Sequence, residues 1–241
     1  MSFPFIEHVV RLHSAGAEWA ARARWRGARI WRAQQQGAPL AACADLLEQA
    51  PRSQVRFLDR ATVLLGFPHV HYLMLPWQTG LYSQADWQDF AEAMFSQQAG
   101  LDPEHWQVQL ANSPFGQQRL AVATPRDLLQ DLRELFKLQR LPLFTCTPLL
   151  TAVAQQYWRH LPADCVLAVA ETDSLSCLYR QHGVIDQVCV IPTQPGSALS
   201  DNLFNADLLA ERHAPQTVVI ASTPVEHRLG PVHPWLEEAP A

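Results

Sequence analysis

The feature that most limits the fold of this chain is a pattern of short elements that occurs twice. The first set of three strand-like runs is expected at residues 55–59, 61–67 and 70–75. The second set is expected at residues 165–170, 175–179 and 184–191. Each set precedes a helix and a further strand, and such repetition of element order indicates an internal repeat. We therefore predict an α/β chain that contains two βββαβ units.

The remaining elements follow from turn residues and apolar periodicity. The helix after the first set is expected to begin after Ser83, a favourable N-cap, and to end at Gly100. Thr124-Pro125 is expected to open another helix, because proline is favoured at the first helical position. The other helices are expected at residues 40–49, 149–160 and 199–212, and the other strands at residues 106–111, 118–123, 141–145 and 217–221. The tail from Pro224 onward is expected to be irregular.

The N-terminal region is expected to lie outside this repeat. Residues 5–34 are predicted to be mostly helix, since many of their apolar side chains fall on one side of a helical wheel. Three regions follow from this prediction. They are a basic helical arm at residues 1–50, a first subdomain at residues 51–145, and a second subdomain with its tail at residues 146–241.

Charge is distributed unevenly along the chain, and this asymmetry suggests a separate role for the arm. Residues 1–36 carry six Arg and two Glu, whereas the other residues carry twelve basic and twenty-one acidic side chains. Arginines interleaved with tryptophans can contact a protein groove, a membrane surface or the acidic remainder of the same chain. The candidate contact residues are Trp19, Arg22, Trp25, Arg26, Arg29 and Arg32. Nucleic acid is not expected as a partner, because the net charge is −5 and the chain contains a single Lys.

Several classes of protein are not expected. No apolar stretch is long enough to span a membrane, and Glu7 and His8 interrupt the pattern of a signal peptide. The five Cys residues are odd in number and lack C-x-x-C spacing, so reduced thiols in the cytosol are expected. His69 and His71 are interpreted as ordinary strand histidines, because two ligands without a third do not make a zinc site.

Three stretches of sequence carry a resemblance to a known family. They are CVLAVAETDSLSCLYRQHGVIDQVCVIPTQ at residues 165–194, HYLMLPW at residues 71–77 and SQADWQDFAEAMF at residues 83–95. The region from about residue 55 to residue 221 resembles the PilM-like proteins of type IV pilus assembly and the cytoplasmic domain of GspL-like proteins of type II secretion. The resemblance implies a duplicated ribonuclease-H-like (actin-like) fold, to which the N-terminal helical arm would be appended.

The resemblance also implies where a nucleotide would bind, and the sequence departs from the family there. Actin-like ATPases carry a phosphate loop of the type Asp-x-Gly-x-x-Thr, in which the glycine lets the backbone approach phosphate and the Asp serves the bound metal. The corresponding stretches here, residues 58–62 and 170–174, contain no glycine. The candidate remnants of the two loops are Asp59, Thr62, Glu171, Asp173 and Ser174. We therefore expect no cofactor and no catalysis, with binding of ATP and Mg²⁺ as the alternative.

The expected function is that of a non-catalytic scaffold in a type IV pilus or type II secretion-like assembly platform. The resemblance implies a cytoplasmic location, peripheral association with the inner membrane, and binding to an inner-membrane platform protein. An anionic membrane surface and a second copy of the chain are further partners that the sequence leaves open.

Two alternative functions are kept beside the scaffold. One is an active actin-like ATPase of the same machinery. The other is a ribonuclease-H-like nuclease in which Asp59, Glu171 and Asp173 hold two metal ions.

Overall fold

The structure of this protein, a computed structural model, describes residues 5–23, 29–194, 196–221 and 225–236. The chain divides into two compact units. Unit 1 comprises residues 1–69, 128–159 and 219–241, and unit 2 comprises residues 70–127 and 160–218. Each unit is therefore assembled from segments that are distant in the sequence.

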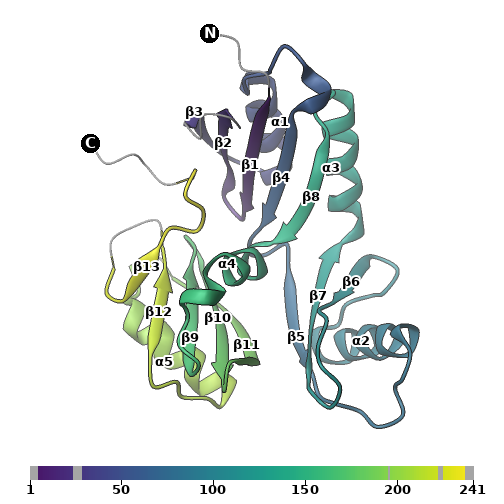
Figure 1. The fold of residues 1–241 in the computed structure, drawn as a ribbon, viewed down its shortest axis with the longest axis vertical. Helices are drawn as coiled ribbons and strands as arrows, with labels where there is room; N and C mark the ends of the chain where they lie inside the picture. The colour runs from purple at the N-terminus through teal and green to yellow at the C-terminus, as the bar shows by residue number, and fades with distance from the viewer. Residues whose placement is uncertain (1–4, 24–28, 195, 222–224, 237–241) are drawn as a thin grey trace. The chain divides into compact units, whose positions relative to one another are not determined.

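A five-stranded mixed sheet forms the framework of unit 1 (Figure 1). Its strands are β1 (Ile6–His13), β2 (Gly16–Ala23), β3 (Arg29–Gln36), β4 (Arg60–Leu65) and β8 (Leu143–Pro148). They lie in the order β3-β2-β1-β4-β8. β1 pairs antiparallel with β2 and β2 pairs antiparallel with β3, whereas the β1–β4 and β4–β8 pairs are parallel. β1 is thus the central strand of the sheet.

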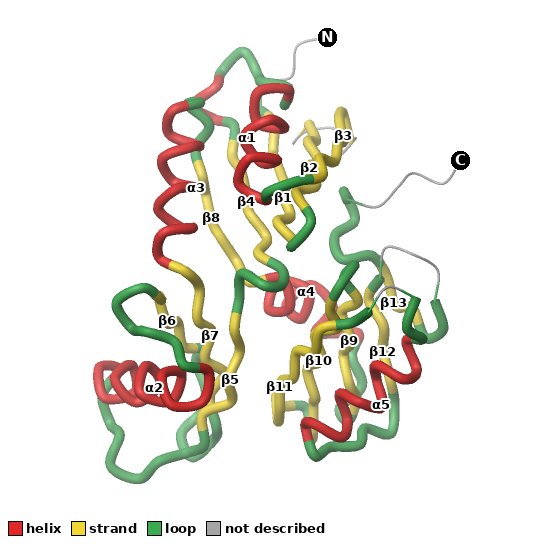
Figure 2. The backbone as a smooth tube through the Cα atoms, turned by 180° about the vertical axis from the view of Figure 1, so that it is seen from behind, coloured by secondary structure: helices red, strands yellow, loops and turns green. Residues whose placement is uncertain are grey.

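Two helices cover one face of this sheet (Figure 2). They are α1 (Pro39–Gln49) and α3 (Arg126–Leu138). Trp19 on β2 is fully buried and stacks on Phe136 of α3, with the ring centroids 5.7 Å apart. The other helical segments nearby are η1 (Arg56–Leu58), a 3-10 turn before β4, and α4 (Leu149–Tyr157) with the 3-10 turn η2 (Trp158–His160) after β8. The core of unit 1 therefore lies between the sheet and the two helices α1 and α3.

The predicted helix over residues 5–34 is wrong, because β1, β2 and β3 occupy this part of the chain except for residues 24–28, which lie outside the described residues. Seven of the eight residues of β1 are buried, so both faces are covered and the alternation typical of a half-exposed strand is absent. Gly16–Ala23 is rich in Ala, which favours helix in isolation, but its pairing with β1 and β3 overrides that preference. The N-terminal region is therefore part of the first sheet, and the expected divisions near residues 50 and 145 are not those of the compact units.

In the first predicted set of three strands, the second and third strands are confirmed, but the first strand and the grouping of all three are wrong. Residues 55–59 contain η1, and the next two runs correspond to β4 and to β5 (His71–Leu75), which belong to different sheets. β4 lies between β1 and β8, whereas β5 pairs with β7 (Arg119–Pro125). The first copy of the repeat therefore starts at β1 and runs β1-β2-β3-α1-β4.

A three-stranded antiparallel sheet and one helix form the first part of unit 2. The strand order is β5-β7-β6, with β6 at Trp106–Leu110, and the helix is α2 (Gln84–Ala99). The predicted N-cap is confirmed, since the Ser83 hydroxyl oxygen accepts a hydrogen bond from the backbone N–H of Asp86 at 3.0 Å. The side chains that α2 buries against the sheet are Trp87, Ala91 and Phe95.

The second five-stranded sheet has the same strand order as the first. Its strands are β9 (Cys165–Ala170), β10 (Ser174–Gln181), β11 (Val184–Pro192), β12 (Thr217–Ile220) and β13 (Arg228–Gly230), in the order β11-β10-β9-β12-β13. Antiparallel pairs join β9 to β10 and β10 to β11, and α5 (Leu199–Ala210) precedes β12. The strands and the helix predicted for this half are confirmed, and the tail that was expected to be irregular contributes β13.

Deletion of residues 1–36 tests the placement of the N-terminal strands. We expect the remaining chain to be insoluble or to lack cooperative unfolding, because removal of β1–β3 exposes the apolar faces of α1, α3 and β4. Circular dichroism and size-exclusion chromatography, compared with the full chain, measure this. A soluble, monomeric remainder with a cooperative thermal transition would show that the N-terminal region is an appended arm after all.

Candidate functional site

Asp59 was a candidate remnant of a phosphate loop, and the structure uses it to hold the chain together. It lies between η1 and β4 and is 0% exposed. One carboxylate oxygen accepts a hydrogen bond from the backbone N–H of Ile6 at 2.9 Å, and the other accepts from the backbone N–H of Ser53 at 3.0 Å. A carboxylate that is buried and satisfied in this way is unavailable to a metal ion or a nucleotide.

Thr62 faces a polar cavity within unit 1, with a volume of about 400 Å³. It lies in the middle of β4, opposite Val9 of β1 and Thr145 of β8. Thr145 in turn places its hydroxyl oxygen 3.1 Å from that of Thr147. The other polar side chains that line the cavity are Glu7, His8, Arg60, Gln155, Gln156 and His233. Thr62 therefore belongs to the face of a sheet and not to a turn that could wrap a phosphate.

Glu171, Asp173 and Ser174 come together in the tight turn between β9 and β10. The Glu171 N–H donates to the carbonyl oxygen of Ser174 at 2.9 Å, and the Thr193 N–H donates to the carbonyl oxygen of Asp173 at 2.8 Å. Two side-chain atoms in this turn, Oδ1 of Asp173 and Oγ of Ser174, are buried without a hydrogen-bond partner in the described part of the chain. This turn is therefore compact and polar, but it has no glycine at which the backbone could approach phosphate.

The structure does not support the metal cluster that the nuclease alternative requires. Both carboxylate oxygens of Asp59 already accept hydrogen bonds from backbone N–H groups. Within the described residues, no group of three or more His, Cys, Asp or Glu side chains is arranged to hold a metal ion. Burial lowers the pKa of both His69 and His71, and the ring of His71 packs edge-on against Trp106 with centroids 4.9 Å apart.

The arginines and tryptophans at the N-terminus have several different environments. Trp19 is a core residue, and Trp25 and Arg26 lie outside the described residues. Arg22 pairs with Glu7 at 3.3 Å and places its guanidinium 3.7 Å from the centroid of a Trp235 ring. Arg29 on β3 donates to the carbonyl oxygen of Trp235 at 3.2 Å, and Arg32 is half-buried on the same strand.

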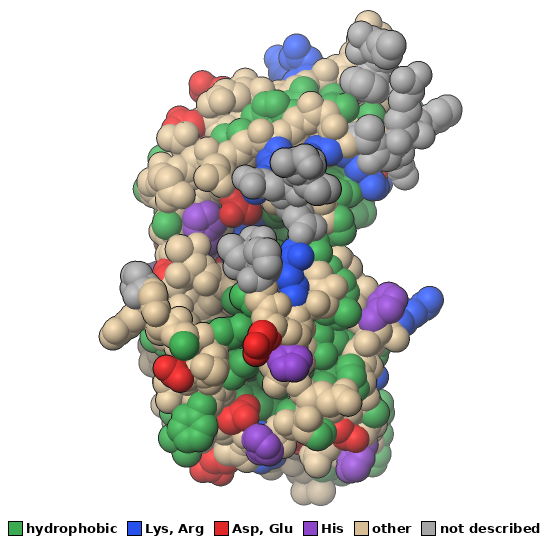
Figure 3. Space-filling model, turned by 90° about the vertical axis from the view of Figure 1, so that its left-hand side faces the viewer, with side chains coloured by type: hydrophobic (Ala, Val, Ile, Leu, Met, Phe, Trp, Pro, Cys, Tyr) green, Lys and Arg blue, Asp and Glu red, His purple; other side chains and the backbone are tan. Residues whose placement is uncertain are grey.

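These contacts tie the N-terminal strands to the C-terminal segment of unit 1. Several Lys or Arg side chains lie near one another in the upper part of the face shown in Figure 3. Arg22 and Arg29 both contact Trp235, so part of the basic charge of the N-terminal strands serves an internal contact. In the described part of the chain, no helix has the length and apolar composition needed to cross a membrane.

Comparison with known proteins rests on structure alone, because neither protein-family models nor curated protein sequences match this chain. The cytoplasmic domain of EpsL, an inner membrane component of the type II secretion system of Vibrio cholerae, is similar with a TM-score of 0.64 and 14% identity. That match covers 89% of this chain and 82% of the EpsL domain. A Bacteroides thetaiotaomicron protein with an actin-like ATPase fold is similar with a TM-score of 0.62 and 10% identity, over 92% of this chain and 83% of that protein.

A third structure extends the comparison to pilus proteins. A chain of the PilM-PilN type IV pilus biogenesis complex is similar with a TM-score of 0.55 and 15% identity, over 85% of this chain and 67% of that chain. The present chain has the actin-like fold. Its two halves are the two ribonuclease-H-like units of that fold, and their equal strand orders identify equivalent turns.

The equivalence of the two halves corrects the position of the first candidate loop. In an actin-like fold with this topology, the turn that corresponds to β9–β10 is β1–β2, at His13–Gly16, and not residues 58–62. The Ala15 N–H in that turn donates to Nδ1 of His13 at 3.3 Å. Gly16 is required for packing, because a Cβ atom there would overlap the carbonyl oxygen of Gln35. The sequence signal that could have found this turn is His-Ser-Ala-Gly between two apolar runs.

Replacement of Asp59 tests its structural role. Asp59→Ala leaves two buried N–H groups without acceptors, and we expect the free energy of unfolding to fall by about 2–5 kcal/mol. Urea denaturation followed by tryptophan fluorescence measures the change. The matched control is Asp173→Ala, which removes an oxygen that has no hydrogen-bond partner and should leave stability unchanged or increased. Equal stability of Asp59→Ala and the unaltered chain would contradict this role.

His8 is buried and His233 is half-buried, and we expect acid to lower the free energy of unfolding because of them. Burial, together with the charge of Arg52, lowers the pKa of His8 from 6.5 to about 3, and burial beside Arg22 lowers that of His233 to about 4. His8 is 1% exposed, and its Nδ1 accepts a hydrogen bond from Nε1 of Trp19 at 3.1 Å. Both histidines are therefore neutral when folded, so their contribution to stability is complete above pH about 6.5 and is lost as the pH falls toward these lowered values.

We expect the free energy of unfolding to fall between pH 7 and pH 5, by about 1.4 kcal/mol per pH unit below 6.5 for His8 alone. Urea denaturation at a series of pH values measures the slope. His8→Gln keeps an acceptor for Trp19 but cannot take up a proton, so its slope should be smaller. A slope that is the same with and without His8 would contradict the assignment.

Proposed function

We propose that this chain is a non-catalytic scaffold of a type IV pilus or type II secretion-like assembly platform, which binds an inner-membrane partner from the cytoplasm. The observation that carries the proposal is the structural likeness to the cytoplasmic domain of EpsL over 89% of this chain. EpsL is an inner membrane component of a type II secretion system, and PilM forms a complex with PilN in type IV pilus biogenesis. These two likenesses support a place in such a platform, and the second supports a protein partner.

The chemistry of the candidate phosphate turns supports a role without catalysis. Asp59 is buried and occupied by two backbone N–H groups. In the β1–β2 turn the Ala15 N–H is bonded to His13, and in the β9–β10 turn the Glu171 N–H is bonded to Ser174. A phosphate cradle needs backbone N–H groups directed at the ligand, so these internal bonds oppose nucleotide binding.

One observation favours the alternative of an actin-like ATPase. The buried Oδ1 of Asp173 and Oγ of Ser174 have no hydrogen-bond partner in the described residues, and they lie in a turn that can bind phosphate in this fold. Unpartnered buried polar atoms are uncommon in folded proteins and sometimes mark a missing ligand. We rank this alternative second because a single turn with two such atoms supplies neither glycine nor a cation for phosphate.

The internal contacts of Arg22 and Arg29 support membrane association through a protein partner rather than through lipid. Both arginines contact Trp235 within unit 1, and Arg22 also pairs with Glu7. Charges that are paired inside the protein add little attraction to an anionic bilayer. We therefore propose that a membrane protein recruits the chain to the inner membrane.

Cross-linking in cells, followed by sedimentation with membrane vesicles, tests the scaffold proposal. The full chain, affinity-tagged in its native host, is cross-linked in cells, and cross-linked proteins are identified by mass spectrometry. We expect an inner-membrane protein to be recovered, and we expect inner-membrane vesicles that contain it to sediment the purified chain. Protein-free vesicles of the same lipids are the control and should not. Equal sedimentation with both kinds of vesicle, or with neither, would contradict recruitment by a protein partner.

Calorimetric titration with ATP and Mg²⁺ separates the scaffold from the ATPase. We expect no measurable heat of binding at micromolar protein concentration, because neither turn presents a phosphate cradle. Asp173→Ala serves as the companion variant. Micromolar binding by the unaltered chain that Asp173→Ala abolishes would establish a nucleotide site in the β9–β10 turn and favour the ATPase.

A further inference from the structure

A large groove on unit 1 is lined by none of the candidate phosphate-loop residues. It has a volume of about 770 Å³, which is within the range of ligand-binding pockets. One wall is the loop at residues 54–57, the opposite wall is the C-terminal half of α3, and residues 140–143 close one end. The groove is formed by unit 1 alone. We call it the basic groove, because its charged lining residues are Arg56, Arg133, Lys137 and Arg140.

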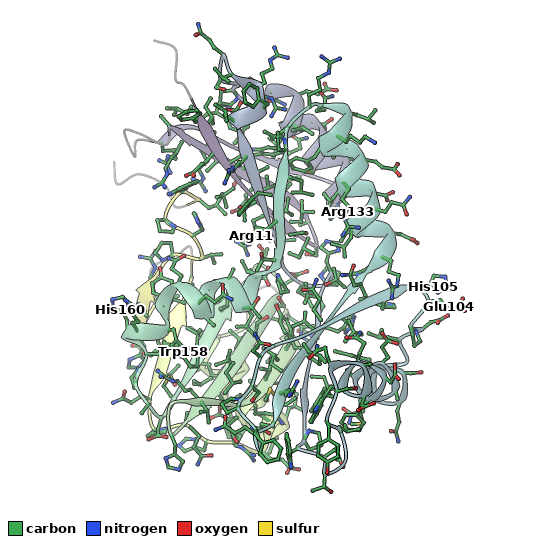
Figure 4. The ribbon with its side chains drawn as sticks, turned by 45° about the vertical axis from the view of Figure 1, so that its right-hand side comes forward. Arg11, Glu104, His105, Arg133, Trp158 and His160 are labelled. Atoms are coloured by element: carbon green, nitrogen blue, oxygen red, sulfur yellow. The ribbon has the colours of Figure 1, made fainter. Side chains whose placement is uncertain are left out.

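The charge of the basic groove is unusual for this chain. The net charge of the whole protein is −5, yet the residues that line the groove include four cations and no carboxylate. Arg133, on α3 (Figure 4), is followed one helical turn later by Lys137, so these two side chains lie along the same wall, and Arg140 belongs to the segment that closes one end. All four cations are exposed.

These four side chains are not neutralised within the protein. In the described part of the chain, none of them donates a side-chain hydrogen bond or forms an ion pair, whereas Arg22 and Arg212 each pair with an acidic residue. Like charges held close together repel one another, which disfavours such a cluster unless it has another role. The unpaired cluster therefore indicates that an anionic partner neutralises it from outside.

The surface between the cations is apolar. Among its apolar lining residues, Pro142 is exposed, Val55 and Leu143 are half-buried, and Phe136 and Leu141 are almost fully buried. Phe57, on the loop opposite α3, is 76% exposed. A large aromatic side chain that is exposed beside a concave apolar surface is typical of a protein-binding site.

The cations and the apolar side chains of the groove are complementary to a partner that carries both carboxylates and apolar side chains. We propose that the basic groove binds an acidic peptide segment of a partner protein, with an apolar side chain against Phe57 and carboxylates on Arg56, Arg133, Lys137 and Arg140. β8 is the outermost strand of its sheet, and Leu143 at its start lines the groove, so an extended peptide has a strand edge beside it. The inference goes beyond the proposed function and does not depend on it.

The shape and charge of the molecule favour a peptide over the other anionic polymers. A nucleic acid carries a phosphate at every nucleotide, so it would extend beyond the groove, where the acidic remainder of this chain would repel it. A bilayer presents a flat surface, whereas the groove is hollowed, with a volume of about 770 Å³ and a lining that is partly apolar. A peptide can enter the concavity and place its acidic side chains on the rim.

A peptide-display selection on the immobilised full chain tests the proposal, followed by fluorescence anisotropy with a labelled synthetic copy of the enriched peptide. We expect enrichment of peptides that combine Asp or Glu with Leu, Phe or Trp, and weaker binding at higher salt. The variant Arg133→Glu with Lys137→Glu should weaken binding by about tenfold or more. Phe57→Ser should weaken it independently of salt. Both variants change exposed side chains, and circular dichroism verifies their folding.

The chain offers matched controls for each variant. Arg126→Glu with Arg159→Glu produces the same change in net charge at exposed sites outside the groove, and Phe204→Ser removes a comparably exposed aromatic side chain from α5. Both control variants should bind as the unaltered chain does. Enrichment of peptides without acidic residues, or equal binding by the groove variants and the controls, would overturn the proposal. So would a selection that enriches nothing while phosphatidylglycerol vesicles or single-stranded DNA bind through Arg133 and Lys137.

Discussion

The parallel pairing of β1 with β4 is the interaction on which the rest of unit 1 depends. Asp59, immediately before β4, accepts a hydrogen bond from the N–H of Ile6 at the start of β1, and this bond fixes the register in which Glu7 lies opposite Arg60. Its second oxygen holds Ser53, which precedes η1. With β1 in place, β2 and β3 extend the sheet, and Trp19 is brought against α3. One buried carboxylate therefore joins the first strand to a segment fifty-three residues later.

Residues that resemble functional groups in the sequence have structural roles in the first half of the molecule. The Asp59 carboxylate accepts a hydrogen bond from the backbone instead of binding a ligand. Gly16 has no Cβ atom that would overlap the carbonyl oxygen of Gln35 on the neighbouring strand. Arg22 and Arg29 hold the C-terminal segment. The basic groove, in contrast, is a surface feature whose lining contains four cations and no carboxylate.

The sequence predicts the second half of the fold better than the first, for a physical reason. β9–β11 are bounded by turn residues, including His182-Gly183, and their order leads to the duplicated fold. β1 and β2 are buried on both faces and carry Ala, Arg and Trp, so their pattern is not periodic as a strand and is compatible with a helix. Because the first copy of the repeat was predicted to start near residue 55 and not at β1, the first phosphate turn was predicted at residues 58–62, which include Asp59. Neither the burial of Asp59 nor the basic groove could be predicted, because both arise from contacts between segments far apart in the sequence.

Hydrogen–deuterium exchange on the full chain, read by mass spectrometry, tests the central claim that β1 is the middle strand of the first sheet. In the structure the amides of β1 are bonded between β2 and β4, so the peptide that covers Ile6–His13 should exchange as slowly as the peptide that covers Arg60–Leu65. Exchange of the first peptide within seconds, while the second stays protected, would contradict the account, because β4 would then be ordered without β1.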